Sequence, residues 1–220
     1  MADNSRLKYG LVNFLTITGD LMVLNILWVF CSLPIVTIGP STNALFKISF
    51  DLIDGQPTKV IRIFFKTFKD NFKQSFVIGI FFILAAVTIY FDIAYVIAME
   101  GTIRRLYIII TCIALAIVLT IITYLNGLVC KYNNTLKGHI INTFKLAFTH
   151  PIRTIIMWVV IASPVLCLRF VPFIVILYLG WFFILFFISL PIFICSIILN
   201  SIFKKFSEVE KVWIESKQEN

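Results

Sequence analysis

Side chains that carry catalytic chemistry are few in this chain. The two histidines, His139 and His150, fall in one polar connection, and no GxSxG, HExxH or P-loop pattern accompanies them. His150 directly precedes Pro151, a position more typical of a helix cap or surface residue than of a ligand. The sequence therefore predicts no catalytic, cofactor-binding or metal-binding residues, and a protein that is not an enzyme.

The five cysteines lie in or beside apolar runs and form no CxxC pair. Such placement is typical of small apolar side chains with reduced thiols, and not of a disulfide framework or a metal site. The cysteines are Cys31, Cys112, Cys130, Cys167 and Cys195.

Charged side chains within membrane spans usually mark a transport path. Here they are few, and all are predicted to lie near the outer boundary: Asp20, Asp92, Glu100, Arg104, Arg105 and Arg169. The simpler interpretation is a set of interfacial charges that reach water or pair with one another. The alternative is an outer vestibule in which Asp92 faces Arg169.

The composition points to a membrane protein. Hydrophobic residues make up 60% of the chain and charged residues 14%, against about 25% charged in an average soluble domain. About 20 apolar residues in a helix cross a hydrocarbon core, and five stretches qualify. They are residues 21–38, 76–97, 106–129, 152–168 and 171–199. Because these runs do not alternate as barrel strands would, we expect an all-α, polytopic membrane helical bundle, with residues 1–220 as a single integral membrane domain.

The first twenty residues allow two interpretations. Apolar positions at helical spacing fit a short surface helix, with Asp20 as the N-cap of the first span. The alternative is one long helix that begins near Tyr9.

A sequence motif in the first span returns near the C-terminus with identical spacing. Ser32, Leu33, Pro34 and Ile35, followed by Asn43, Phe46 and Lys47, correspond to Ser189, Leu190, Pro191 and Ile192, followed by Asn200, Phe203 and Lys204. The motif predicts a kink at each proline and a polar turn at each asparagine. Gly39-Pro40 is expected to end the first span, because proline disfavours helix before it.

Two connections are basic and amphipathic. In the longer one, residues 39–75, apolar side chains recur every three or four residues after a turn at Asp54-Gly55, and lysine or arginine fills the other positions. Apolar residues 141–152 match residues 61–72 at an offset of 80. Either helix fits the headgroup region or the packed cytoplasmic side of the bundle, and both interpretations can hold at once.

These similarities predict a parallel internal repeat. Its units are residues 21–97 and 106–168, with a partial third unit at 171–206. Each complete unit contains two spans and one basic amphipathic helix on the cytoplasmic side, so both copies face the same way, unlike the inverted repeats of many transporters.

The distribution of lysine and arginine predicts the orientation. With the amphipathic connections inside, the inner side holds fourteen of these residues and the outer side five. We therefore expect a multi-pass cell-membrane protein with its N-terminus outside and its C-terminus cytoplasmic. The net charge of +8 then fits anionic headgroups of the inner leaflet as a partner, and not nucleic acid.

The stretch LNILWVFCSLPIVTIGPSTNAL (Leu24–Leu45), together with FFKTFKDNFKQSF (Phe64–Phe76), resembles the YesL family of bacterial membrane proteins, grouped as DUF624. The resemblance covers nearly the whole chain. Members of that family are often encoded beside carbohydrate ABC uptake systems, so the resemblance implies a role tied to sugar import. It supplies no catalytic residues.

Three functions stay open at this point. The first is an accessory component of a carbohydrate ABC uptake system, with a permease or a second copy of the chain as partner. The second is a small transporter or channel, and the third is a lipid-interacting regulatory module. The chain lacks the EAA-x3-G motif through which ABC permeases dock their ATPase, which argues against a permease proper.

Overall fold

A buried helix, α2 (Ile38–Ile53), lies at the centre of the molecule. The computed structural model describes residues 2–56, 59–98, 100–132, 134–170, 180 and 185–218, and the regular elements among them are all helical. Helix α2 packs against α1, α3, α4, α6 and α10, and most of its residues are buried. This is a correction, because the sequence predicted a polar connection over residues 39–75.

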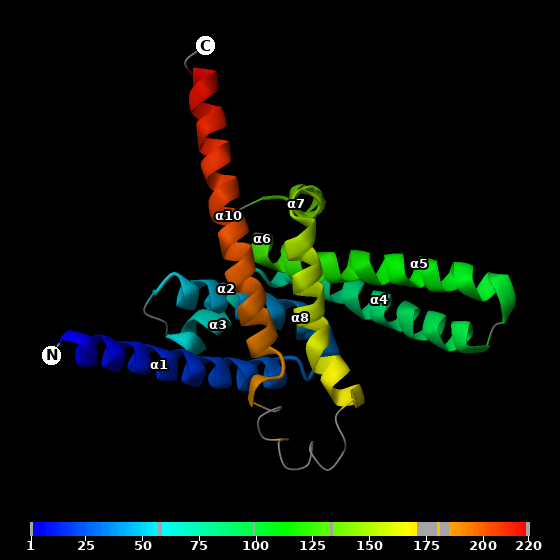
Figure 1. The fold of residues 1–220 in the computed structure, drawn as a ribbon, viewed down its shortest axis with the longest axis horizontal. Helices are drawn as coiled ribbons and strands as arrows, with labels where there is room; N and C mark the ends of the chain where they lie inside the picture. Colours follow the sequence, from blue (N-terminus) through cyan, green and yellow to red (C-terminus); the bar gives the residue numbers. More distant parts are fainter. Residues whose placement is uncertain are drawn as a thin grey trace.

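Helix α2 forms an antiparallel hairpin with the long N-terminal helix α1 (Ala2–Cys31), as Figure 1 shows. The Trp28 indole donates to Thr42 Oγ1 at 3.0 Å, and Leu21 shares a buried cluster with Ile48. Between the helices, Pro34 is extended and is followed by a short 3₁₀ turn, η1 (Ile35–Thr37). Proline lacks an amide hydrogen, so the break falls at this position.

The N-terminal helix decides between the two predicted alternatives. A single long helix is correct, and Asp20 lies inside it, so Asp20 is not an N-cap. Pro34 ends the first span instead of kinking it. Gly39 and Pro40 lie in the first turn of α2, where proline is tolerated because its missing amide has no intrahelical acceptor.

The next two helices are joined at Asn71. Helix α3 (Val60–Asp70) buries Val60, Phe64 and Thr67 against its neighbours, while Ile61 remains exposed. The packed interpretation therefore holds for one face of this basic helix, and its opposite face is free for headgroups. Helix α4 (Phe72–Ala98) follows and agrees with the predicted span at 76–97.

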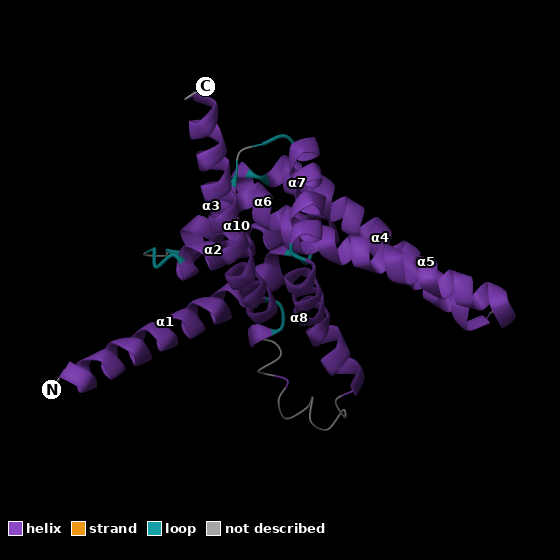
Figure 2. Ribbon diagram, turned by 45° about the horizontal axis from the view of Figure 1, so that its top comes forward, coloured by secondary structure: helices purple, strands orange, loops and turns teal. Residues whose placement is uncertain are grey.

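A second hairpin projects from the rest of the molecule. Gly101, with φ of +79°, opens helix α5 (Gly101–Thr120), which returns beside α4. The helix continues through a π-helical turn, η2 (Ile121–Leu125), into α6 (Asn126–Lys131). Figures 1 and 2 both show the far half of the α4–α5 hairpin extending away from the other helices.

The C-terminal part contains three further helices. Helix α7 (Leu136–Thr149) turns by 107° into α8 (Pro151–Phe170), which agrees with the predicted span at 152–168. Helix α10 (Ser189–Gln218) begins two residues before Pro191, so this proline also lies at a helix start and forms no kink. Of the predicted fifth span, residues 171–179 and 181–184 lie outside the described residues, and the part from Ser189 onward belongs to α10.

The described helices are long and apolar enough to make the chain a multi-pass membrane protein. Four of them qualify by length and hydropathy, and the bent α7–α8 pair adds a fifth if it crosses as one broken span. The fold class is therefore an all-α membrane helical bundle with four to five such segments. The internal repeat stays a prediction.

Candidate functional site

Asn43 is the centre of a buried polar network. It lies in the middle of α2 with no exposed surface, although the sequence predicted a turn there. Its Nδ2 donates to the Asn126 carbonyl at 3.1 Å, and its Oδ1 accepts from Asn71 Nδ2 at 3.0 Å. One side chain thus joins α2 to α6 and to the α3–α4 junction, which satisfies a polar group that would be costly to bury unpaired.

The π-helical turn stands directly before Asn126. Single π turns are frequent at functional sites, because they shift the side chains that follow. Asn126 Nδ2 donates back to the Ile122 carbonyl at 3.1 Å, and its buried Oδ1 has no protein partner among the described residues. In the same turn, the Tyr124 hydroxyl lies 2.9 Å from Thr154 Oγ1 on α8.

A second, charged layer lies further along α2 and α6 and also includes α10. Lys131, at the end of α6, donates to Asn200 Oδ1 on α10. Asn200 Nδ2 donates to Asp54 Oδ1 at 2.9 Å, and Lys204 Nζ lies 3.3 Å from the same carboxylate oxygen. The relay joins the ends of α2 and α6 to the middle of α10.

Aromatic rings enclose the lysine of this relay. Lys131 Nζ lies 5.0 Å from the ring centroid of Phe50 and 5.9 Å from that of Phe203, and the two rings are 6.0 Å apart. Such cation–π contacts contribute about 0.5–2 kcal/mol each, depending on desolvation. The hydrogen bond from Asn200, followed by the bond and charge of Lys204, lowers the pKa of Asp54 despite its partial burial.

Comparison with known proteins adds the family. Residues 21–93 match the family model described as "Protein of unknown function, DUF624". The chain is also 29% identical over 164 residues to "Uncharacterized protein YesL" of Bacillus subtilis (strain 168), which covers 72% of this chain and 76% of that protein. The chain belongs to the DUF624 family. No solved structure matches it.

The part of this DUF624 protein that matches the family model holds one half of the network. It contains Asn43, Asn71 and Asp54, whereas Lys131 and Asn200 lie beyond it. It also contains α1 from Leu21 onward, the whole of α2, and the crossing of α2 with α4. The partners Asn126, Lys131 and Asn200 come from the helices that close over this region.

The network holds helices together and offers no reactive group. Its carboxylate is already paired with Asn200 and Lys204, and its ammonium with an amide and two rings. No group of three potential metal ligands occurs among the residues that the structure describes. The arrangement fixes where α10 lies relative to α2.

The histidines of this family member lie on α7 and at its end, whereas Cys130 lies on α6 directly before Lys131 of the network. His139 is buried in α7 with an unpaired Nε2 among the described atoms, and His150 lies at the α7–α8 bend. Within the described residues the five cysteines are free thiols, of which Cys195 is buried. Asp92 is half-buried on α4, but the side chain of Arg169 lies outside the described residues, so their pairing stays a prediction.

The sequence singles out Asn43, Asn200 and Lys204 through the repeated motif, but it does not indicate their hydrogen-bond partners. The spacing of Asn43 with Lys47, and of Asn200 with Lys204, is one helical turn. A polar turn does not require a four-residue spacing, so this spacing was the sequence feature that indicated a helix at these positions. The contacts of Asn200 with Asp54 and Lys131 could not be predicted from the local sequence.

Proposed function

We propose that this DUF624 protein is a non-enzymatic accessory component of a carbohydrate uptake system, associated with an ABC-type permease. The family resemblance supports the link to sugar import. The observation that carries the accessory role is the projecting α4–α5 hairpin, since Leu84, Phe91 and Ile110 remain exposed on it. Helices in lipid associate by packing, and a hairpin that projects from the other helices offers apolar faces against which a partner can pack.

The test is photo-crosslinking in native membranes. A photoreactive residue at Leu84 or Ile110 should give an adduct that contains a membrane permease. Ile61 on α3 is a matched control, because it is exposed and apolar but lies on another element. Equal adducts from all three positions would contradict a specific role for the hairpin.

Growth of a deletion strain tests the link to carbohydrate uptake. Deletion of the gene should impair growth on one oligosaccharide and leave growth on glucose normal. Purified protein alone, reconstituted in vesicles, should move no sugar. Sugar flux by the purified protein would replace the accessory role with the transporter alternative.

The proposal includes an orientation with the C-terminus in the cytoplasm. The sequence placed the N-terminus outside, but the direction of α1 supports the cytoplasmic side for this end too. Helix α2 runs antiparallel to α1 and ends at Asp54, which pairs with Lys204 on the basic side. With Arg6 and Lys8 moved inside, the bias of basic residues rises from fourteen against five to sixteen against three.

A further inference from the structure

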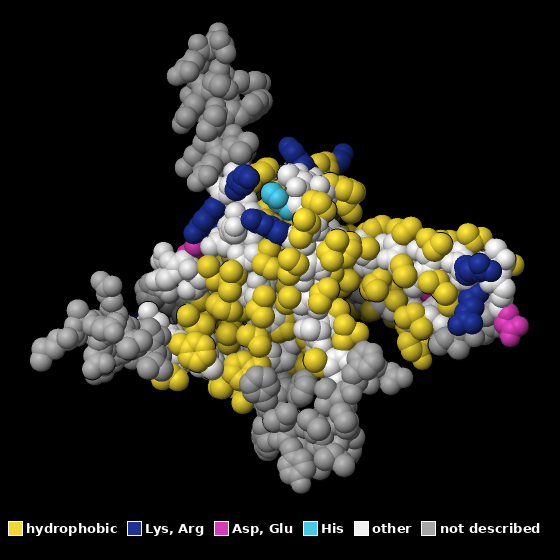
Figure 3. Space-filling view, in the orientation of Figure 1, with side chains coloured by type: hydrophobic (Ala, Val, Ile, Leu, Met, Phe, Trp, Pro, Cys, Tyr) yellow, Lys and Arg dark blue, Asp and Glu magenta, His cyan; other side chains and the backbone are white. Residues whose placement is uncertain are grey.

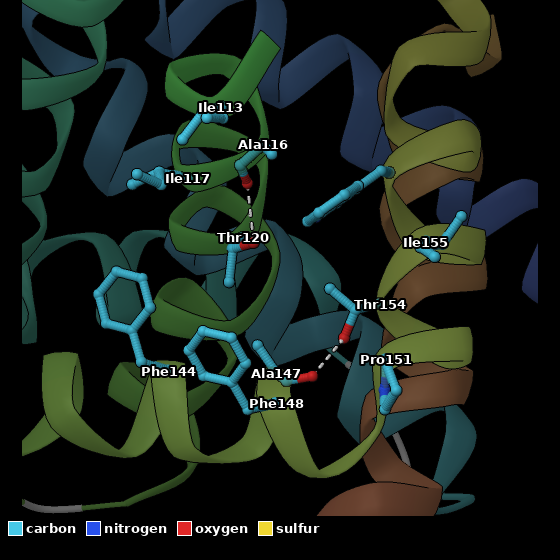
Figure 4. Close-up of a pocket in the computed structure, with 11 residues that line it drawn as sticks. Ile113, Ala116, Ile117, Thr120, Phe144, Ala147, Phe148, Pro151, Thr154 and Ile155 are labelled. Atoms are coloured by element: carbon cyan, nitrogen blue, oxygen red, sulfur yellow. Dashed lines mark hydrogen bonds between the residues drawn. The ribbon is translucent and has the colours of Figure 1, made fainter. Parts of the chain in front are cut away.

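An apolar pocket of about 330 Å³ lies in the corner where α7 meets α8, with α5 as its third wall. Figure 4 shows Phe144 and Phe148 from α7, Ile113 and Ile117 from α5, and Ile155 from α8 around it. This volume is near the lower end for ligand pockets, about 300–1,000 Å³, and is too narrow for a helix about 10 Å across.

The two threonine hydroxyls in the wall are already hydrogen-bonded. Thr120 Oγ1 donates to the Ala116 carbonyl at 2.8 Å, and Thr154 Oγ1 bonds within its own corner to the Ala147 and His150 carbonyls at 3.3 and 3.0 Å. Apart from the Trp158 indole, whose buried Nε1 has no hydrogen-bond partner among the described residues, the pocket therefore presents hydrocarbon to its occupant. A sugar would leave most of its hydroxyls unpaired there, whereas an acyl chain would not.

The pocket opens onto the outer surface of the molecule, and the α7–α8 bend sets its depth in the membrane. Phe148 is 82% exposed and Ile155 54% exposed, so the mouth faces the lipid-facing surface. Because α7 turns by 107° into α8, a membrane-crossing α8 places α7 along the plane of the interface. The pocket then lies directly below the headgroups.

A basic cluster lies at the same corner. Lys145, Arg153 and Lys205 have no carboxylate within 4.0 Å among the described residues. Lys145 Nζ lies 6.0 Å from the Phe206 ring, and Arg153 Nη1 donates to Ser201 Oγ at 3.3 Å, so α10 closes the cluster. Figure 3 shows lysine and arginine side chains around α7 and the middle of α10, with a histidine among them.

The basic groups surround His150 at the bend. Burial, and then the charges of Arg153 and Lys205, lower the pKa of His150. A cluster of cations without counter-charges attracts an anion, and in this position the anions at hand are lipid phosphates.

We propose that the α7–α8 corner binds one anionic phospholipid of the cytoplasmic leaflet. One acyl chain occupies the pocket, and the phosphate lies against Lys145, Arg153 and Lys205. Both the buried methylenes and the basic residues near the surface contribute to binding. This site does not rest on the proposed accessory role, because it is argued from the α7–α8 bend and its basic residues, although Ile113 and Ile117 of α5 form one wall of the pocket.

Thermal unfolding of the purified full-length protein in neutral detergent tests the headgroup. Phosphatidylglycerol should raise the unfolding midpoint by several degrees, as expected for a ligand that binds only the folded state, while phosphatidylcholine with the same chains should not. Lys145→Gln combined with Arg153→Gln should abolish the rise. Arg104→Gln combined with Arg105→Gln removes the same charge at the far hairpin and should preserve it.

A second variant tests the chain. Ala116→Phe fills the pocket from α5, and we expect it to abolish at least half of the rise without lowering the midpoint of the lipid-free protein. Native mass spectrometry should count one retained phosphatidylglycerol in the wild type and in the Arg104/Arg105 control, and none in the Lys145/Arg153 variant.

Four outcomes would overturn the proposal: equal response to both lipids, a full rise with glycerol phosphate alone, an unchanged rise in the Ala116→Phe variant, or a rise that persists in the Lys145/Arg153 variant. If phosphatidylglycerol has no effect and a co-purifying protein is lost from the Lys145/Arg153 variant, the corner is a protein-binding surface instead.

Discussion

Gly39 and Gly79 set how closely α2 approaches α4. A β-carbon added at Gly39 would lie 2.0 Å from the Ser75 carbonyl oxygen and 2.8 Å from Gly79 Cα, and these backbone atoms have no rotamer by which to move away. Small residues allow such backbone contact between helices in membranes.

We therefore expect Gly39→Ala to destabilise the protein by about 1–3 kcal/mol or more, as for other overpacked sites. The measurement is the thermal midpoint in detergent. Gly19→Ala is the control: it also replaces a helical glycine, but nothing lies within 4 Å of the added carbon. Gly19→Ala should be neutral or stabilising by about 0.5–1 kcal/mol, and similar losses at both sites would contradict the contact.

The ionisation of Asp54 is expected to make the stability of the protein depend on pH. Its pKa in the folded protein is lowered by Asn200 first and by Lys204, so its contribution to stability is present above its unfolded pKa of about 3.9. That contribution is lost as the pH falls through the folded pKa.

Wild type should therefore have a higher thermal midpoint than Asp54→Asn at pH 7, and the two should converge as the pH falls toward 3. Lys47→Gln is a matched control, since Lys47 pairs with Asp51 and not with Asp54. A difference between wild type and Asp54→Asn that stays constant down to pH 3 would show that the carboxylate charge contributes nothing.

At the scale of elements, one side chain of α1 caps a helix that begins more than 160 residues later. Asn25 Oδ1 accepts the backbone amides of Ile188 and Ser189, both at 3.0 Å, at the start of α10. Helix N-termini carry unpaired amides, and a buried start requires an acceptor.

Asn25→Ala should cost about 1–3 kcal/mol, because it leaves these amides buried without a partner. Hydrogen exchange should rise in the first turn of α10 and stay unchanged in α4. Asn13→Ala, at an exposed position of the same helix, is the control. Unchanged exchange in α10 after Asn25→Ala would exclude the cap.

The elements also explain which sequence predictions failed. The sequence predicts a connection where α2 lies, because Gly39, Pro40, Ser41 and Asn43 fall within five residues, a composition typical of loops. In the structure Gly39 allows the backbone of α4 to approach, and Asn43 forms a hydrogen bond to α6. The helices α4 and α8 were predicted well, because a long apolar run with flanking charges has one interpretation.

At the scale of the molecule, helix directions predict the positions of both termini. Single cysteines in a cysteine-free background should react with an impermeant reagent from outside at Gly101, between α4 and α5. Cysteines at Ser5, near the N-terminus, and at Gly55, at the end of α2, should react only after the membrane is permeabilised. Labelling of Ser5 in intact cells would restore the N-terminus outside and require α1 to cross in the opposite direction.

The sequence by itself determined the environment and the class of fold. An apolar content of 60% and apolar runs of about 20 residues indicate that the chain is surrounded by lipid. In lipid, the backbone amides and carbonyls must form hydrogen bonds within the protein, which helices provide. Length and composition decide this, and both are local properties that can be summed along the chain.

Only the tertiary structure decided what the polar residues do. The pairing of Asn43 with Asn126, and of Asp54 with Asn200 at a separation of 146 residues, depends on the crossing of α2 with α6 and α10. A buried amide looks the same in sequence as an amide in a turn, because both are polar residues between apolar ones. The physical difference is the partner on another helix, and the packing of the helices supplies that partner.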